Sequence, residues 1–269
     1  MLQCKHSILL LLMTIGFVDF YSCNQKESIS LKIMSYNIRH GYGLDNVQDL
    51  SRSAKIIVSA APDLCGLQEI DNFCLRSDSI GQTDYLAKKT SMEGIFSKFM
   101  DFDKGAYGMS TLSTKKIIST KFLKLPDAKY EPRTSIINEV QITKGYTILF
   151  ANVHFDWILE KEGSANRLNQ AKALVKYLNK SELACVIVGD FNCTPKSATM
   201  QYFCSEGFIF VDKGLDKFSY QGDHQLEIDH LLFRDSRDVQ FEKKEVLLLQ
   251  KPLASDHRPL IVELEATLN

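Results

Sequence analysis

Several features that would define a protein class are absent from this chain of 269 residues. Its 32 basic and 33 acidic side chains nearly cancel, so it lacks the broad excess of Lys and Arg with which many proteins hold nucleic acid. It also lacks repeats and low-complexity linkers, and 45% of its residues are hydrophobic. This composition excludes fibrous and disordered classes and allows a large buried core.

No apolar run near the N-terminus is long enough to cross a bilayer as a helix. Residues 8–18 are apolar, follow Lys5 and precede Ser22-Cys23, which resembles a bacterial lipoprotein signal. We predict a signal peptide over residues 1–22, a lipidated Cys23 and a tether over residues 23–30. The protein would then be exported and held to a membrane of the cell envelope. A buried helix, or a signal cut elsewhere, is the alternative.

Paired cysteines are missing as well. No CxxC pair is present to hold zinc, and five cysteines would remain besides Cys4 and Cys23. An odd number without paired spacing argues against a disulfide scaffold. Cys65 and Cys185 lie in apolar runs and are expected to pack as small hydrophobic residues.

Strands and helices alternate along the rest of the chain. Residues 31–37 and 64–68 are predicted strands, and the apolar stripe from Val47 to Ala61 predicts a helix between them that ends at Pro62. A second helical stripe covers residues 164–179, and Thr194-Pro195 predicts the start of a third helix. The other predicted strands are 94–102, 109–112, 117–125, 135–142, 147–153, 184–188, 228–233, 239–249 and 260–264. This order favours a single domain over residues 31–269 with two stacked sheets flanked by helices.

Polar side chains follow the apolar runs at the points where strands end. Asn37 follows the first strand and Glu69 the second. Their oxygens suit a hard cation such as magnesium, calcium or manganese. Taken singly, a loop-forming Asn37 and a solvated Glu69 are the simpler interpretations.

The segment from Val186 to Asn192 is the most specific of these strand ends. A lone carboxylate cannot stay inside an aliphatic run, so Asp190 must emerge beside a donor or a counter-charge. If the segment stays extended, Asp190 and Asn192 point the same way, and one can take a proton from water while the other donates to a phosphate. An Asx turn is the alternative.

Three further polar segments complete the set. Ser255-Asp256-His257 places a histidine beside a carboxylate, which favours a protonated imidazole that can stabilise a phosphoryl oxygen. Arg258 is better explained by a structural ion pair. Asp229 follows an apolar residue at a predicted strand start, and His154 ends another strand, where a hydrogen-bonded core histidine is an equal alternative.

Together these motifs resemble the endonuclease/exonuclease/phosphatase superfamily, which includes deoxyribonuclease I, and especially its bacterial secreted hydrolase branch. The resemblance covers residues 31–264. The motifs that occur in the family's order are Asn37, Gln68-Glu69, His154, Gly189-Asp190-Phe191-Asn192, Asp229-His230 and Ser255-Asp256-His257. Glu131-Pro132-Arg133 also resembles a family position, with structural pairing as the alternative.

The resemblance implies a four-layer α/β/β/α sandwich and metal-dependent phosphoester hydrolysis. By that likeness Asn37, Glu69 and Asp256 are the metal ligands, for Mg²⁺ or for Mn²⁺ or Ca²⁺. The catalytic residues it implies are His154, Asp190, Asn192, Asp229 and His257. Asp190 would activate water, Asn192 and His154 would hold phosphate oxygens, and His257, with Asp229 as its partner, would stabilise the developing charge.

The substrate is left open by the sequence. A monomeric phosphodiesterase acting on a lipid head group or another small phosphoester is favoured, since no long basic or aromatic insertion is present to grip a duplex. A nuclease of the same fold is the first alternative. A noncatalytic binding lipoprotein is the second, although binding alone gives no evident need for both Asp190 and His257.

Overall fold

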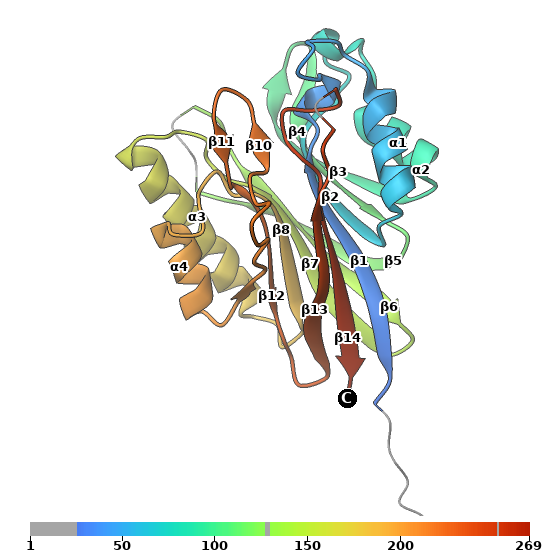
Figure 1. Ribbon diagram of the computed structural model, residues 1–269, viewed down its shortest axis with the longest axis vertical. Coiled ribbons are helices and arrows are strands. Elements are labelled where there is room, and N and C mark those ends of the chain that lie inside the picture. The colour runs from blue at the N-terminus through green and yellow to red at the C-terminus, as the bar shows by residue number, and fades with distance from the viewer. Residues whose placement is uncertain (1–25, 127–129, 252) are drawn as a thin grey trace, which may run out of the picture.

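Two six-stranded sheets stack face to face in the computed structural model, which describes residues 26–126, 130–251 and 253–269 (Figure 1). The predicted signal peptide and Cys23 lie outside the described residues. The first sheet, in the order β13-β14-β1-β2-β4-β3, contains β1 (Ser28–Asn37), β2 (Leu64–Asn72), β3 (Glu93–Phe102), β4 (Gly105–Ser113), β13 (Val239–Leu248) and β14 (Leu260–Leu268). The second, in the order β5-β6-β7-β8-β12-β9, contains β5 (Lys116–Lys124), β6 (Thr134–Thr143), β7 (Tyr146–His154), β8 (Cys185–Asp190), β9 (Ile209–Phe210) and β12 (Asp229–Arg234).

The apolar core between the sheets explains why their central strands are hydrophobic. Phe150 of β7 and Val186 of β8 pack there with Val262 of β14 and Leu64 of β2. Because helices cover the outer faces, β8 is buried on both sides and reads as a continuous apolar run. Cys65 and Cys185 are fully buried, as expected of small hydrophobic residues.

Helices form the two outer layers. The helical segments are α1 (Leu50–Ala60), α2 (Gln82–Thr90), α3 (Lys161–Leu178), α4 (Ala198–Ser205) and the short 3-10 turns η1 (Arg39–Gly41) and η2 (Leu75–Ser77). Ile57 of α1 and Leu86 of α2 pack on the first sheet. Leu174 of α3 and Phe203 of α4 pack on the second. Helices α1 and α2 thus lie on one side of the paired sheets and α3 and α4 on the other (Figure 1). The predicted four-layer α/β/β/α sandwich is confirmed. None of the helices in the described part of the chain is long and apolar enough to span a membrane.

Some predicted boundaries differ from the structure. β1 begins at Ser28, which pairs with Thr267 of β14, so the end of the predicted tether belongs to the sheet. The helix predicted to start at Thr194-Pro195 starts at Ala198, because the Ser197 hydroxyl caps it by accepting a hydrogen bond from the Met200 N–H. Helix α2 was not predicted, since its nine residues carry only a short apolar stripe.

Candidate active site

A cavity of about 590 Å³ opens at one end of the paired sheets. It is bounded on one side by a separate hairpin, β10 (Tyr220–Gln221) and β11 (Gln225–Leu226). The structure places six of the eight predicted site residues on its wall, namely Glu69, His154, Asp190, Asn192, Asp256 and His257. The other two, Asn37 and Asp229, are fully buried and hydrogen-bond to members of that wall. Six distant stretches of chain therefore converge on one hollow.

Asp190 lies at the centre because of strand register. It ends β8, where it pairs with His154 of β7 on one side and with Asp229 of β12 on the other. Gly189 has φ +151°, and a Cβ there would lie 2.0 Å from the Val153 carbonyl oxygen. Glycine is therefore required at position 189, directly before Asp190 at the end of the strand.

The environment of Asp190 makes its carboxyl an unusually weak acid. The residue is 2% exposed, and Asn37 Nδ2 donates to its Oδ2 at 3.2 Å. Burial and the neighbouring Asp229 carboxylate raise the pKa of Asp190 to about 7. A carboxyl with such a pKa can accept a proton near neutral pH.

Asn192 reaches the cavity by a turn, and the expectation of an extended segment is wrong. Its φ is +50°, and its backbone N–H donates to Asp190 Oδ1 at 2.9 Å, which is the Asx turn left open as the alternative. One side-chain N–H of Asn192 donates to the Phe155 carbonyl at 3.1 Å. The amide has a second N–H, which remains able to donate to a ligand.

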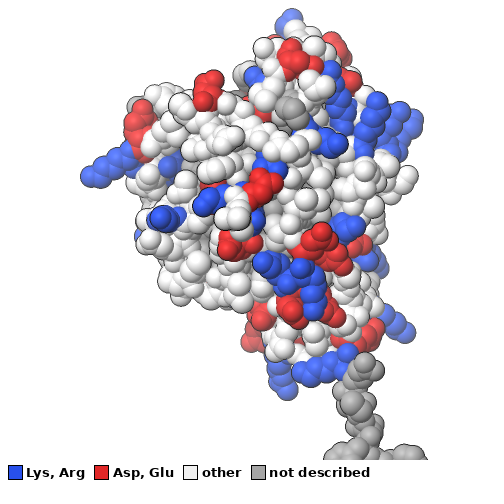
Figure 2. Space-filling model, in the orientation of Figure 1, with Lys and Arg blue, Asp and Glu red and all other residues white. Residues whose placement is uncertain are grey.

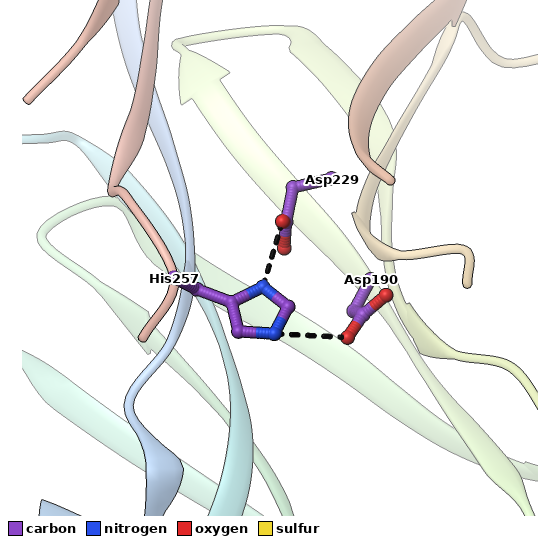
Figure 3. Close-up of side chains that lie close together, drawn as sticks. All are labelled: Asp190, Asp229 and His257. Atoms are coloured by element: carbon purple, nitrogen blue, oxygen red, sulfur yellow. Dashed lines mark hydrogen bonds and ion pairs between the residues drawn. The ribbon is translucent and has the colours of Figure 1, made fainter. Parts of the chain in front are cut away.

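His257 bridges two carboxylates in Figure 3. Its Nδ1 lies 2.8 Å from Asp229 Oδ2 and its Nε2 lies 3.8 Å from Asp190 Oδ2. Burial alone would lower the pKa of His257, but the Asp229 carboxylate raises it to about 10. The ring is therefore a buried cation at neutral pH.

The segment that carries His257 is fixed at both ends. The Ser255 hydroxyl donates to the Asn37 carbonyl at 2.7 Å and accepts from the His257 N–H at 3.0 Å. Arg258 forms a bidentate pair with Asp216 at 2.5 and 2.7 Å and also donates to the Leu248 carbonyl. The structural interpretation of Arg258 is thus confirmed.

Glu69 and Asp256 form a second pair of acidic groups on the wall. Glu69 has φ +55° at a register shift between β2 and β4, which displaces it from the ladder towards the cavity. Burial would raise the pKa of Glu69, but the His40 imidazole 3.6 Å away, the His154 ring and the Asn37 amide hold it well below its usual range. Burial and the negative charge of Glu69 raise the pKa of Asp256. Two mutually repelling carboxylates facing a cavity fit a hard divalent cation.

Asn37 connects this acidic pair to Asp190. Its Nδ2 donates to Glu69 Oε1 at 3.0 Å as well as to Asp190, and its Oδ1 accepts from the Arg39 N–H at 3.0 Å. In this arrangement Asn37 holds the two carboxylates by its amide nitrogen. Its predicted role as a metal ligand stays a prediction.

Asp190, Asp229 and His257 are also close enough together to hold a metal ion, with ligand atoms within 4.8 Å of one another. The 2.8 Å contact between His257 and Asp229 has the length of a charge-assisted hydrogen bond, which already accounts for these three groups. A hard cation also prefers oxygen ligands to an imidazole. Glu69 and Asp256 therefore suit such a cation better.

His154 is 3% exposed and neutral. Burial and the nearby Arg133 cation hold the pKa of His154 well below its usual value. Its Nε2 lies 3.6 Å from Asp190 Oδ2, too far for a hydrogen bond, and its Nδ1 has no partner. The neutral ring can donate a single N–H to a phosphoryl oxygen.

A buried network supports the loop that carries Asp190 and Asn192. Lys213 Nζ lies 2.9 Å from Glu227 Oε1 and 3.0 Å from His230 Nδ1. Because an ammonium only donates, Nδ1 must accept, and the proton of His230 lies on Nε2, which donates to the Cys193 carbonyl at 2.8 Å. Lys213 thereby fixes the tautomer of His230 and the position of Cys193.

Other lining residues were not among the predicted site residues. Trp157, Tyr220, Asp223 and His224 line the cavity. The sole tryptophan directly after the His154-Phe155-Asp156 motif was a usable signal. Asp223 and His224 connect two strands of two residues each, too short to leave a pattern in the sequence.

Residues 34–257 match the Endonuclease/Exonuclease/phosphatase family. The chain belongs to this family. No curated protein matches the chain significantly. The match covers most of the described domain and includes all eight predicted site residues. On this endonuclease/exonuclease/phosphatase scaffold, Asp190, Asp229 and His257 form a buried cluster at the ends of strands.

Solved structures of low sequence identity share the fold. The endonuclease/exonuclease/phosphatase from Beutenbergia cavernae is similar with a TM-score of 0.74 and 16% identity, covering 89% of this chain and 72% of that one. The catalytic domain of human Nocturnin with bound sulfate gives 0.71 and 18%, covering 90% and 98%. A mannosyl-6-phosphatase from Bacteroides thetaiotaomicron gives 0.65 and 20%, covering 87% and 99%.

Proposed function

We propose that this protein is a divalent-metal-dependent phosphoester hydrolase in which Asp190 prepares a water molecule for attack on phosphorus. The observation that carries the proposal is the position of Asp190 between the His257 cation and Asn37, on the wall of one cavity with Glu69 and Asp256. Acidic groups for a cation and donors for a phosphate meet there, as in-line phosphoryl transfer requires.

Glu69 and Asp256 are the residues that would hold the metal, with Asn37 beside them. When bound, the cation would neutralise phosphoryl oxygens and lower the barrier to attack. Asn37 keeps Glu69 and Asp190 in fixed positions through its two N–H donors.

The remaining roles follow from the protonation states. The Asp190 carboxylate accepts a hydrogen bond from the water molecule and takes its proton during attack. The His257 cation, held by Asp229, faces the developing negative charge, and the free N–H groups of Asn192 and His154 orient phosphoryl oxygens. Each group acts without moving, since Asp190, Asp229, His154 and His257 are nearly fully buried.

A small phosphoester or a lipid head group is the proposed substrate. On the face seen in Figure 2, Lys and Arg side chains gather near α1 and α2 and are mixed with Asp and Glu elsewhere, so no basic surface extends across this face. One structurally similar protein is named a mannosyl-6-phosphatase, which supports the proposal of a small substrate. A nuclease activity is the alternative that a substrate screen would reveal.

Export and anchoring are also part of the proposal. The apolar segment at residues 8–18 followed by Cys23 supports a lipoprotein signal, and the enzyme would act as a monomer at a membrane of the cell envelope. Mass spectrometry of the protein from a bacterial host would test this. A lipid mass on a chain that starts at Cys23 is expected, and an unmodified chain that retains residues 1–22 would contradict it.

Metal removal tests the proposed activity. Hydrolysis of a panel of phospholipids, nucleotides, sugar phosphates and DNA, followed by phosphate release for monoesters and by separation of the cleavage products for diesters, should stop in EDTA and return with magnesium or manganese. Calorimetry should detect Mg²⁺ binding to the parent protein and much weaker binding to Glu69→Gln. Activity that survives complete metal removal, or unchanged binding by this variant, would refute the metal site.

A further inference from the structure

The part of the cavity lining around Trp157 and the β10–β11 hairpin differs in chemistry from the part that carries the proposed catalytic residues. Trp157, the only tryptophan in the chain, is 48% exposed and lines the wall beside Leu159. Tyr220 and Leu226 of the β10–β11 hairpin belong to the same lining. An exposed indole at a cavity rim offers a flat apolar surface on which the C–H face of a ring can pack.

Acidic groups accompany this aromatic surface. Glu131 and Asp223 also line the cavity, and His224 lies next to Asp223 in the sequence. Carboxylates only accept hydrogen bonds, so they are suited to hydroxyl groups and unsuited to phosphates. No lysine lines the described wall of this cavity, and its single arginine is Arg133.

The charge of Arg133 is already balanced. Its Nη1 lies 2.7 Å from Glu131 Oε2, and its guanidinium lies over the Phe99 ring at 5.2 Å. A second phosphate on a substrate would therefore meet no free cation on this wall and would meet Asp223. Several phosphates, as in a nucleic acid or a polyphosphorylated polyol, would be repelled.

Arg133 still has hydrogen-bond donors to spare. The residue is 1% exposed, and neither its Nε nor its Nη1 makes a hydrogen bond among the described residues, although Nη1 lies at ion-pair distance from Glu131. Arg133 lies on the cavity wall with His154, whose Nδ1 is likewise unpartnered. Leaving such donors unpaired is costly in a buried site, and a terminal phosphate with three free oxygens would satisfy both.

We propose that the substrate is a monophosphate ester of an uncharged, polyhydroxylated ring, that is, a sugar monophosphate. This rests on the proposed hydrolase function and specifies its substrate class. Water adds to phosphorus, the bond from phosphorus to the sugar oxygen breaks, and the sugar oxygen leaves with a proton to give the free sugar and inorganic phosphate. The sugar ring packs on Trp157, and its hydroxyls donate to Glu131 and Asp223. The cavity volume of about 590 Å³ accommodates a ligand of this size.

Matched substrates test the charge argument. Hydrolysis should be measured with magnesium for fructose 6-phosphate, mannose 6-phosphate, fructose 1,6-bisphosphate, an inositol trisphosphate and a short DNA duplex, by phosphate release for the monoesters and by strand cleavage for the DNA. The 6-monophosphates should have kcat/KM at least tenfold above that of the bisphosphate and of the other polyanions. Equal or better hydrolysis of the bisphosphate, the inositol or the DNA would overturn the proposal.

Variants of the wall test the assigned contacts. Trp157→Ala should raise KM for the preferred sugar phosphate about tenfold with a much smaller change in kcat, because the ring contact is the same in ground and transition states. Glu131→Gln should also raise KM, and Asp223→Lys should improve the bisphosphate relative to the monophosphate. Phe122→Ala is the matched control, since Phe122 is 49% exposed on β5 outside the cavity.

The failure of this proposal can be told from failure of the hydrolase function. If Asp190→Asn abolishes a metal-dependent phosphatase activity while Trp157→Ala and Asp223→Lys leave the order of substrates unchanged, the substrate class is wrong and the hydrolase remains. If Asp190→Asn changes no hydrolysis at all, the proposed function is wrong and this inference falls with it. A KM effect of Phe122→Ala equal to that of Trp157→Ala would also overturn the role of Trp157.

Discussion

His257 and Asp229 form a buried ion pair, with 2.8 Å between Nδ1 and Oδ2, at the point where the C-terminal segment meets β12. The pair keeps a cation beside Asp190, whose carboxyl is made basic by the same burial. The His257 cation, which can donate a proton, and the Asp190 carboxylate, which can accept one, are thus held with Nε2 and Oδ2 3.8 Å apart.

The first prediction concerns Asp229→Asn. Loss of the carboxylate should lower the pKa of His257 from about 10 towards its ordinary range, so the ring would lose its charge near neutral pH. We expect kcat to fall on the order of a hundredfold at pH 8. Asp84→Asn is the control, because Asp84 is exposed on α2 outside the cavity and should leave the pH profile unchanged. A profile of Asp229→Asn that coincides with that of the parent would contradict the role of the pair.

The pH dependence of the parent enzyme is a second prediction. Asp190 must be ionised to accept a proton, so activity should rise as the pH passes through about 7. His257 must be protonated, so activity should fall as the pH passes through about 10. Initial rates of phosphate release between pH 5 and pH 11 would show this bell-shaped profile. A rate that is flat across this range would be inconsistent with both assignments.

A third prediction links Asp190 to stability. The folded-state pKa of its carboxyl lies above the unfolded value of about 3.9. The stabilisation that this shift contributes is complete below pH 4 and is lost as the pH rises through about 7. In EDTA, Asp190→Asn should therefore have a higher melting temperature than the parent at pH 8 and a smaller advantage at pH 5. Thermal unfolding at the two pH values measures this, and a lower melting temperature at pH 8 would count against the buried charge.

The fourth prediction tests the network beneath the catalytic loop. Lys213→Met leaves Glu227 without its partner and removes the donor that fixes the tautomer of His230. Breaking such a buried pair should cost about 3 kcal/mol in the free energy of unfolding, measured by urea denaturation. The double variant Lys213→Met/Glu227→Leu should recover part of that loss, since no uncompensated charge remains. Equal stability of the single variant and the parent would show that the pair contributes nothing.

Much of the fold could be predicted from the sequence because buried strands leave continuous apolar runs. The segment from Cys185 to Val188 is such a run, and the position of Asp190 at its end followed from the cost of burying a lone carboxylate. Helix α2 and the β10–β11 hairpin left no comparable pattern, because they are short and packed at the periphery.

The convergence of the site was predicted from motif order, but its internal geometry was not. Asn192 turns back on Asp190 through a positive φ, which no periodicity indicates. The contact of Asn37 with both Glu69 and Asp190 depends on the register of β1, β2 and β8. Asn37 and Asp190 are 153 residues apart in the sequence, so long-range packing sets this register. Such relationships become visible only when the sheets are assembled.

The rate of phosphate release by Asp190→Asn shows whether the Asp190 carboxylate activates the attacking water. The variant keeps the shape of the side chain and removes the group that accepts the proton of the attacking water. With magnesium and the best substrate of the parent, we expect a rate at least a hundredfold below that of the parent, with an unchanged circular dichroism spectrum. A folded Asp190→Asn protein that hydrolyses the substrate at the parent rate would contradict it.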